Sequence, residues 1–394
     1  MGLQGKISEL KIDRLKKIKI IADYKIPFLK GALEPFAEIS YQSPSQITKD
    51  TIKGADALLV RTRTKCNAEL LEKSSIKFIG TATIGYDHID TLFCNSKGIK
   101  WVNAPGCNSG SVEQYVASAL LTLAKQNNIK LTDKTIGIIG VGNVGSKVEK
   151  IAKLFGMKVL LNDPPRERSE GSEKFVSLNQ LVDKSDIISF HVPLNIVGVD
   201  KTYHLADEMF FEKLHGGKIF INTSRGEVVS TGSLNDAIKM GNVTISVLDV
   251  WENEPSIDTE LLSLTDLASP HIAGYSIEGK ANGTAACVNA LNDFFNLGLQ
   301  PNWYPQQLPY PNRSKEIKID CMGKSPQEVF YDCIVTTYNI VEDDKRLRTS
   351  VAEFEKQREE YPIRREFDYY NVHLTNANAS LQRTIIELGF NLIK

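Results

Sequence analysis

The sequence has no surplus of charge of either sign. Its 47 lysine and arginine residues are balanced by 48 aspartate and glutamate residues, so the formal net charge is -1. Proteins that bind nucleic acids or anionic membranes usually carry a strongly basic surface, and the balance therefore argues against both kinds of partner. A local basic cluster could still bind a small anion.

Paired cysteines and long apolar runs are also missing. The six cysteines are widely scattered and form no CxxC pair, which argues against a disulfide framework. No apolar run approaches the roughly 18 residues of a membrane span, and residues 1–17 lack the apolar core of a secretory signal. We therefore expect a soluble, cytoplasmic protein without a bound metal, in which residues 1–17 form a short lead-in.

From residue 18 the chain alternates short β-rich runs with helical stretches such as Asn67–Lys73 and Ile89–Ser96. This alternation is typical of a parallel sheet with crossover helices. A longer helical stretch, Ser109–Gln126, follows, with apolar residues at helical spacing. The strands expected in this part are Ile18–Ala22, Ala57–Arg61, Phe78–Thr81 and Lys100–Asn103.

A second alternating unit begins at Lys134. Several of its strands are continuous apolar runs, as expected of strands that are buried on both faces. Six strands with intervening helices have the size of a complete dinucleotide-binding domain. The expected strands are Thr135–Ile139, Lys158–Leu161, Asp186–His191, Lys218–Asn222, Thr244–Leu248 and Leu267–Ala268.

The composition changes after about Asn302, where prolines crowd residues 301–311 as in a linker. Beyond them, two β-rich runs and a helical run indicate a small α+β unit. Its middle, residues 343–365, is very charged and contains no catalytic motif, so we expect this unit to serve assembly. The three runs are Glu316–Met322, Pro326–Asn339 and Tyr369–Leu374.

The segment from Thr135 to Gly145 predicts a strand, a GxGxxG turn and a helix. Gly140 permits the tight turn, Gly142 lets the backbone approach a pyrophosphate, and Gly145 allows close packing of helix and strand. The helix would direct its free N–H groups and its positive end at the phosphates. The alternative is an ordinary strand-to-helix turn. The cofactor-binding residues expected here are Gly140, Gly142, Asn143, Val144 and Gly145.

Asp163 ends the next predicted strand. Its carboxylate could accept hydrogen bonds from both ribose hydroxyls of NAD and would repel the 2′-phosphate of NADP. Arg166 and Arg168 follow closely and weaken this preference. The sequence therefore predicts NAD as the cofactor, with a surface aspartate as the alternative reading of Asp163.

Three further segments come just after strands of this unit, where ligands of open α/β sheets bind. Arg225 could hold a carboxylate in its planar fork, and His271 could accept the proton of a hydroxyl group. Glu254 would then orient the imidazole and stabilise its protonated form. Taken singly, Arg225 could be a surface ion-pair residue and His271 a structural one. Asp249 could hold a nicotinamide carboxamide or cap a turn.

Together these segments resemble the D-2-hydroxyacid dehydrogenase superfamily, which has Arg, Glu and His in this order after the glycine turn. The resemblance covers roughly residues 18–300 and makes His271 the acid/base, Glu254 its partner and Arg225 the carboxylate clamp. It implies two Rossmann-like or flavodoxin-like parallel-sheet domains with the cofactor in the cleft between them. The implied boundaries are 18–108 with 275–300 for substrate, 109–274 for NAD and 301–394 for the small C-terminal domain.

Closer features resemble the erythronate-4-phosphate dehydrogenase family. They are Val60–Lys65, Gly80–His88, Ala104–Asn108, Asn162–Arg166, His271–Lys280 and the C-terminal extension, which in that family dimerises. The family oxidises 4-phospho-D-erythronate to 2-oxo-3-hydroxy-4-phosphobutanoate in pyridoxal 5′-phosphate biosynthesis. The resemblance implies substrate contacts at Thr62, Thr83 and Tyr275, and cofactor contacts at Asp163, Val192, Thr223, Ser224, Arg225, Asp249 and Gly274.

The sequence departs from that family at a few positions. Val192 replaces a usual threonine, and Thr223-Ser224 replaces the usual Ala-Cys, although backbone contacts could survive both changes. Arg63 replaces an apolar residue. With Arg61 and Lys65 it makes a basic strand end that could bind a substrate phosphate, or that could simply be solvated. The alternatives to the narrower family are phosphoglycerate dehydrogenase, another hydroxyacid dehydrogenase, or a non-catalytic NAD-sensing module.

Overall fold

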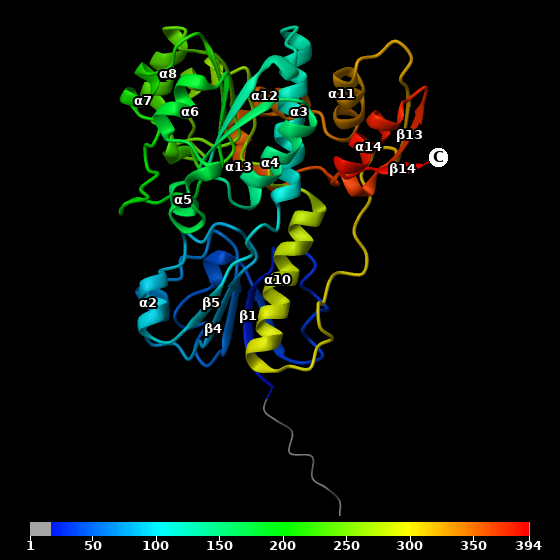
Figure 1. The fold of residues 1–394 in the computed structure, drawn as a ribbon. Coiled ribbons are helices and arrows are strands. Elements are labelled where there is room, and N and C mark those ends of the chain that lie inside the picture. Colours follow the sequence, from blue (N-terminus) through cyan, green and yellow to red (C-terminus); the bar gives the residue numbers. More distant parts are fainter. Residues whose placement is uncertain (1–16, 394) are drawn as a thin grey trace, which may run out of the picture. The chain divides into compact units, whose positions relative to one another are not determined.

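The computed structural model describes residues 17–393, so nearly all of the expected lead-in lies outside the described residues. The chain forms two compact units (Figure 1). The first comprises the residues up to Ala104 together with Gly283–Pro305, and the second comprises Pro105–Asn282 together with the residues from Gln306 onward. Each unit is described by itself.

The first unit is built on a five-stranded parallel sheet with the order β2-β1-β3-β4-β5. Its central strands β3 and β4 are buried throughout, and their alternate side chains enter two separate cores. Leu59 packs with residues of helix α10 on one face, whereas Leu58 packs with Cys94 of helix α2 on the other. The elements are β1 (Lys19–Asp23), β2 (Glu38–Gln42), β3 (Ala57–Val60), α1 (Ala68–Leu71), β4 (Phe78–Thr81), α2 (Thr91–Ser96), β5 (Lys100–Val102) and α10 (Ile277–Phe295).

The second unit contains a six-stranded parallel sheet with the order β11-β10-β9-β8-β6-β7. Its strands are β6 (Thr135–Ile139), β7 (Lys158–Asn162), β8 (Ile187–Phe190), β9 (Lys218–Asn222), β10 (Val243–Leu248) and β11 (Leu267–Ala268). The chain moves from β6 outward to β7 and then returns to the other side of β6. This reversal is a topological switch point, and ligands of such sheets bind at its carboxyl ends.

Six helices connect these strands: α4 (Asn143–Leu154), α5 (Pro164–Glu170), α6 (Leu178–Lys184), α7 (Glu208–Glu212), α8 (Thr231–Lys239) and α9 (Thr259–Leu264). Helix α3 (Ser109–Gln126) precedes the sheet and is buried on nearly all sides. A helix buried all round needs partners on opposite faces. In Figure 1, α4 lies on one side of α3 and α11 on the other, and both helices contact it.

The C-terminal part of this unit has a three-stranded parallel sheet with the order β12-β13-β14. Because helices alternate with its strands, it is α/β where the sequence suggested a small α+β unit. Its apolar residues join the core that surrounds α3, so it is continuous with the sheet domain rather than separate from it. The elements are β12 (Glu316–Asp320), α11 (Pro326–Thr337), α12 (Ile340–Thr349), α13 (Phe354–Glu359), β13 (Asn371–Thr375), α14 (Ala379–Glu387) and β14 (Asn391–Ile393).

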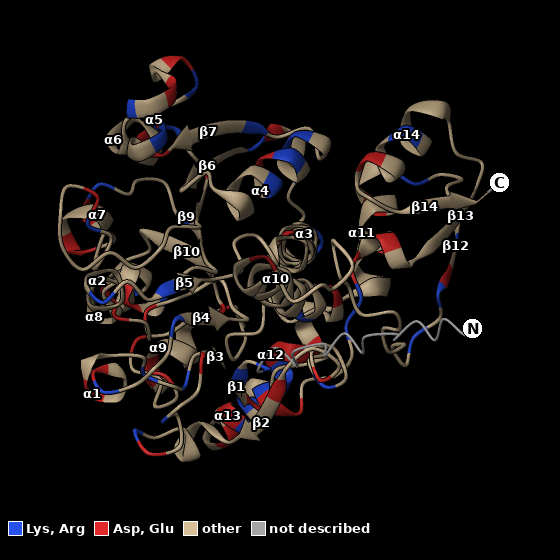
Figure 2. Ribbon diagram, turned by 90° about the horizontal axis from the view of Figure 1, so that it is seen from below, with Lys and Arg blue, Asp and Glu red and all other residues tan. Residues whose placement is uncertain are grey.

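The predicted fold class, two parallel α/β sheets and a smaller third unit, is confirmed. The charged stretch of residues 343–365 forms most of α12 and all of α13, which carry residues of both signs (Figure 2). Among residues 17–393, no helix has the length and apolar character that a membrane crossing requires.

Candidate active site

The glycine turn joins β6 to α4 at the switch point of the six-stranded sheet. Gly140 has φ +86°, and a Cβ atom there would lie 2.7 Å from the carbonyl oxygen of His191. A Cβ atom at Gly145 would lie 2.0 Å from the carbonyl oxygen of Gly140. Both positions therefore require glycine, as the sequence pattern predicts.

The residues at this turn fit a dinucleotide pyrophosphate. A Cβ atom at Gly142 would meet nothing within 4 Å, so the backbone is open on that side. Gly142 is also the N-cap of α4, and no side chain caps the helix there. The first N–H groups of a helix have no acceptor within the helix and favour anions. Asn143 and Val144 begin α4 and belong to this uncapped first turn.

Asp163 is held against the same turn. One carboxylate oxygen accepts the N–H of Val141 at 2.8 Å, and the other accepts the N–H of Arg166 at 3.0 Å. The Arg166 side chain pairs with Glu170 through two hydrogen bonds of 2.6 and 2.8 Å. Arg168 likewise pairs with an aspartate, Asp200, at 2.5 Å. Carboxylates already neutralise Arg166 and Arg168. The two arginines therefore attract the 2′-phosphate of NADP less strongly than their positions in the sequence suggested.

His191 directly follows β8 beside the turn, and it belongs to none of the predicted site motifs. Its Nε2 lies 2.9 Å from Ser189 Oγ, and its Nδ1 lies 3.1 Å from Thr223 Oγ1. Desolvation lowers the pKa of His191 to about 3, so the ring is neutral at physiological pH. The sequence could have pointed to His191, because it directly follows an apolar strand and precedes Val192, a predicted cofactor contact.

Glu254 and His271 form a close pair. Glu254 Oε2 lies 2.7 Å from His271 Nδ1, and its Oε1 accepts the N–H of Trp251 at 3.0 Å. Burial raises the pKa of the Glu254 carboxyl, but the neighbouring His271 and these hydrogen bonds outweigh it, so the pKa lies below its ordinary value. The His271 side chain keeps 30% of its surface exposed, so a substrate can reach it.

Asp249 fixes the loop that carries His271. Its buried carboxylate accepts the N–H of Ile272 at 2.7 Å, the N–H of Ala273 at 2.9 Å and the hydroxyl of Ser269 at 2.6 Å. His271 has φ +57°, a left-handed conformation that a side chain rarely adopts without support. This geometry favours the turn-holding interpretation of Asp249, and its contact with the nicotinamide stays a prediction.

Arg225 follows β9 in a turn that is held by hydrogen bonds between adjacent residues. Asn222 accepts the N–H of Ser224 at 3.0 Å and donates its side-chain amide to the carbonyl of Arg225 at 3.0 Å. The Arg225 guanidinium donates to the carbonyl of Ser224 at 2.8 Å. A Cβ atom at Gly226 would lie 2.0 Å from the carbonyl carbon of Trp251. The loops that carry Arg225 and Glu254 therefore pack directly together.

The C-terminal part of the unit also contacts the His271 loop. The buried guanidinium of Arg364 donates to the carbonyls of Ser111 and Ala273. Glu366 accepts the hydroxyl of Ser276 at 2.7 Å, just before α10 begins. A Cβ atom at Gly274 would lie 2.0 Å from the side-chain nitrogen of Asn108, so a side chain at this position would require Asn108 to move.

In the first unit, the expected substrate residues follow β3 and β4, which are neighbours in the sheet. Arg61 and Thr62 follow β3, and the Arg61 guanidinium donates to the carbonyl of Lys25 at 3.4 Å. Thr83 follows β4; its hydroxyl lies 2.7 Å from that of Thr81 and donates to the carbonyl of Gly85 at 2.9 Å. These residues share one edge of the sheet, as their positions after the strands predict.

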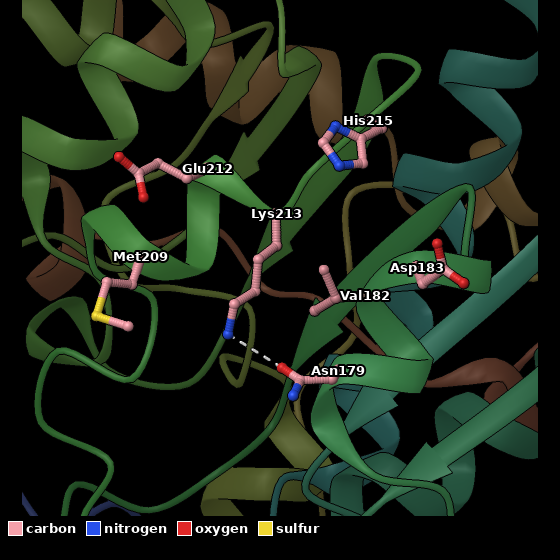
Figure 3. Close-up of a pocket in the computed structure, with 7 residues that line it drawn as sticks. All are labelled: Asn179, Val182, Asp183, Met209, Glu212, Lys213 and His215. Atoms are coloured by element: carbon pink, nitrogen blue, oxygen red, sulfur yellow. Dashed lines mark hydrogen bonds between the residues drawn. The ribbon is translucent and has the colours of Figure 1, made fainter.

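An open hollow of about 360 Å³ lies elsewhere in the second unit, between α6 and α7 (Figure 3). Its residues precede β8 and β9, so they lie toward the amino ends of these strands, whereas the glycine turn follows β6. Lys213 Nζ donates to Asn179 Oδ1 at 3.1 Å across this hollow, and none of the predicted catalytic residues lines it.

No group of three or more His, Cys, Asp and Glu residues in residues 17–393 is arranged to hold a metal ion.

Comparison with known proteins matches both parts of the second unit to families. Residues 112–273 match the family described as "D-isomer specific 2-hydroxyacid dehydrogenase, NAD binding domain". Residues 312–389 match one described as "Domain of unknown function (DUF3410)".

Relatives of nearly full length are similar to the chain. The erythronate-4-phosphate dehydrogenase of Bacteroides thetaiotaomicron is 49% identical over 90% of this chain and 99% of its own length. That of Bacteroides fragilis strain ATCC 25285 is 45% identical over 91% of this chain and 100% of its own length. A crystal structure of D-lactate dehydrogenase from Aquifex aeolicus, complexed with NAD and lactic acid, has a TM-score of 0.58 at 28% identity. It covers 71% of this chain and 95% of its own.

Proposed function

The chain belongs to the erythronate-4-phosphate dehydrogenases, and we propose that it oxidises 4-phospho-D-erythronate to 2-oxo-3-hydroxy-4-phosphobutanoate with NAD, a step of vitamin B6 biosynthesis. The observation that carries this proposal is the pair formed by Glu254 and His271, whose facing atoms lie 2.7 Å apart. It combines a proton acceptor with a carboxylate partner at the carboxyl edge of an NAD-binding sheet.

The reaction removes one proton and one hydride from the substrate. His271 accepts the proton of the C2 hydroxyl, and the carboxylate of Glu254 stabilises the imidazolium that forms. Bound NAD supplies the acceptor for the hydride that leaves C2. The glycine turn and Asp163 hold this cofactor, with further expected contacts from Val192, Thr223, Ser224 and Gly274.

Arg225 holds the substrate carboxylate, because its guanidinium can donate two parallel hydrogen bonds to a planar anion. This clamp directs the C2 hydrogen and stabilises charge that develops on the C2 oxygen. In the first unit, Arg61, Thr62 and Thr83 contribute further substrate contacts. Arg61 supplies positive charge at the end of β3 for a phosphate.

A product assay tests this function. Purified enzyme with NAD is offered 4-phosphoerythronate and 3-phosphoglycerate side by side, and the products are resolved by mass. We expect formation of 2-oxo-3-hydroxy-4-phosphobutanoate with little turnover of 3-phosphoglycerate. Preferential turnover of 3-phosphoglycerate would identify a different dehydrogenase, and NAD binding without turnover of either acid would point to a sensing module.

We also propose that the enzyme is a homodimer that assembles through its C-terminal part, and that it is cytoplasmic. Several large apolar side chains are exposed there, including Tyr310, Met322 and Ile386. Sedimentation equilibrium of the full-length chain tests the assembly, and a monomeric mass would contradict it.

A further inference from the structure

A chain of hydrogen bonds links three side chains at the carboxyl end of β4. His88 Nε2 lies 3.1 Å from Thr81 Oγ1, and Thr81 Oγ1 lies 2.7 Å from Thr83 Oγ1. The hydroxyl of Thr83 in turn donates to the carbonyl of Gly85 at 2.9 Å. The chain therefore runs from a partly buried histidine, through the fully buried Thr81, to a residue that the proposed function places at the substrate.

The backbone at both ends of this chain is fixed by hydrogen bonds from neighbouring segments. The carbonyl of Thr83 accepts the N–H of Ala104 at 3.0 Å, and the carbonyl of His88 accepts the N–H of Cys66 at 2.8 Å. The loop that follows β4 is therefore held where it brings the ring of His88 to the hydroxyl of Thr81.

The hydrogen bonds of the chain run in one direction. A carbonyl oxygen carries no hydrogen, so Thr83 uses its single hydroxyl hydrogen on Gly85 and accepts from Thr81. Thr81 then has no hydrogen left for His88, and it accepts the hydrogen of Nε2. The reverse order would leave the oxygens of Thr83 and Gly85 facing each other at 2.9 Å with no hydrogen between them.

His88 keeps this arrangement with a neutral ring. Desolvation lowers the pKa of His88 to about 4, and the nearby Asp87 raises it by less. At neutral pH the ring therefore holds one proton, which the chain places on Nε2, so that Nδ1 carries none. The tautomer of His88 thus matches the direction of the hydrogen bonds through Thr81 and Thr83.

This direction matters because an anionic oxygen of a substrate can only accept a hydrogen bond. If Thr83 donated to Thr81, its hydrogen would be turned away from the substrate. In the observed direction, Thr83 can turn this hydrogen from the carbonyl of Gly85 to the substrate while its oxygen still accepts from Thr81. We infer that His88 is a positioning residue, which acts through Thr81 to keep the hydroxyl of Thr83 available as a donor to the substrate.

Thr83 lies at the same edge of the sheet as Arg61, to which the proposed function assigns the substrate phosphate. Strands β3 and β4 pair with Val60 opposite Thr81, and the N–H of Ala82 donates to the carbonyl of Val60 at 3.1 Å. The pairing thus extends to the first residue after β4. The inference rests on the proposed function and deepens it, because it adds an uncharged donor and its supporting histidine to this edge.

The alternative is that His88 and Thr81 only stabilise the fold, since a buried hydroxyl needs a hydrogen-bond partner wherever it lies. A double-mutant cycle separates the two roles. If Thr81 acts through Thr83, the effect of Thr81→Val on substrate binding disappears in a chain that already carries Thr83→Val. If Thr81 acts on the fold alone, the two effects add.

The experiment measures the steady-state kinetics of the full-length enzyme with NAD and 4-phosphoerythronate. Thr81→Val and His88→Met remove the hydrogen bonds, whereas Thr81→Ser keeps the hydroxyl and His88→Gln keeps an N–H donor. We expect KM to rise by about 3- to 10-fold in the first two variants, the effect of one lost neutral hydrogen bond, with kcat nearly unchanged. Thr81→Ser and His88→Gln should recover most of the rise. Added to Thr83→Val, Thr81→Val should change KM by less than about twofold.

Thr284→Val is the matched control. The side chain of Thr284 is also buried in the first unit, and its hydroxyl donates to the carbonyl of Pro27 at 2.6 Å. Its loss should lower the melting temperature and leave KM unchanged. Additive effects in the double variant, or an unchanged KM in Thr81→Val, would overturn the inference.

Nitrogen-15 NMR of enzyme with labelled histidines adds a readout that does not depend on turnover. The signals of His88, assigned by their loss in His88→Gln, should show a protonated Nε2 and an unprotonated Nδ1 between about pH 6 and pH 8. A proton on Nδ1 would overturn the inference whatever the kinetics show. If Nε2 is protonated but the wild type does not oxidise 4-phosphoerythronate, the proposed function fails while the hydrogen-bond chain stands.

Discussion

Nδ1 of His271 lies 2.7 Å from Oε2 of Glu254. A carboxylate in this position keeps a proton on Nδ1, which leaves Nε2 as the atom that can accept a proton from a substrate. The left-handed backbone of His271 and the hydrogen bonds from its loop to Asp249 hold the ring in this arrangement. The pair is therefore oriented before a substrate binds.

Replacing His271 tests its role as the proton acceptor. His271→Gln keeps a hydrogen-bonding side chain but removes the ring nitrogen that accepts the proton of the substrate hydroxyl. We expect kcat to fall by at least about 100-fold, the usual contribution of a general base. Steady-state kinetics measures the effect, and fluorescence titration should show little change in NAD affinity. Near-normal turnover would reject the assignment.

Glu254→Gln should alter the pH dependence of the reaction. The variant retains an oxygen that can face His271 but loses the negative charge that stabilises the imidazolium. We expect kcat/KM to fall by about 10- to 100-fold and the acidic limb of its pH profile to move to lower pH. Asp236→Asn on the exposed surface of α8 is the control. An unshifted acidic limb would show that the carboxylate does not act through the imidazole.

The buried strands of the sheets could be predicted because they are short runs of mainly apolar residues. Strand β9 is buried at all five positions, and its apolar sequence predicted both its type and its bounds. The glycine turn was equally clear, since two of its positions tolerate no side chain. Strand β2, by contrast, is only partly buried and contains Glu38 and Gln42, so its sequence does not stand out from a loop.

The burial of charged residues in the C-terminal part could not be predicted from the sequence. Its charged sequence is typical of a solvated surface, yet Asp343 is 3% and Arg364 is 5% exposed. Asp343 is satisfied there by the hydroxyls of Tyr338 and Tyr361, at 2.8 and 2.6 Å. Charge alone cannot distinguish such buried, partnered groups from exposed ones, because the partners are brought together only by the fold.

Asp249 is expected to act as a positioning residue for the His271 loop. In Asp249→Asn, one of the two oxygens that accept loop N–H groups becomes a donor, so a hydrogen bond to Ile272 or Ala273 is lost. We expect kcat to fall by about tenfold or more, together with a lower melting temperature. A fall in NAD affinity alone, with kcat unchanged, would assign Asp249 to the cofactor instead. Kinetics and thermal unfolding together distinguish the two results.

Two desolvated histidines, His191 and His88, should make the folded protein less stable in mild acid. Desolvation lowers the pKa of His191 to about 3 and that of His88 to about 4, both below their ordinary value. The unfolded chain therefore binds more protons than the folded one once the pH falls below about 6.5. Stability is fully present above that pH and should be lost progressively as it falls towards the two folded values.

Urea unfolding between pH 7 and pH 4 measures this effect. His191→Gln should flatten the dependence, because the variant has one fewer group that takes up a proton on unfolding. His215 is exposed, so His215→Gln provides the control variant. An equally steep pH dependence in His191→Gln and the wild type would contradict the prediction.

Phe330 of α11 stacks on Phe155, the residue after α4, with ring centroids 5.6 Å apart. Both rings belong to the core that surrounds α3, so the C-terminal part and the NAD-binding sheet should unfold as one cooperative unit. Phe330→Ala should lower the free energy of unfolding by about 3–5 kcal/mol, the usual cost of truncating a buried phenylalanine. Denaturant unfolding followed by two probes, NAD binding and far-ultraviolet circular dichroism, measures it. If the NAD-binding transition stays at its wild-type midpoint while another transition shifts, the two parts unfold independently.

A chain truncated near Pro301 tests the same point. If the two parts unfold independently, the truncated chain retains a folded NAD-binding domain. If they share one transition, truncation exposes α3 and the NAD-binding domain unfolds.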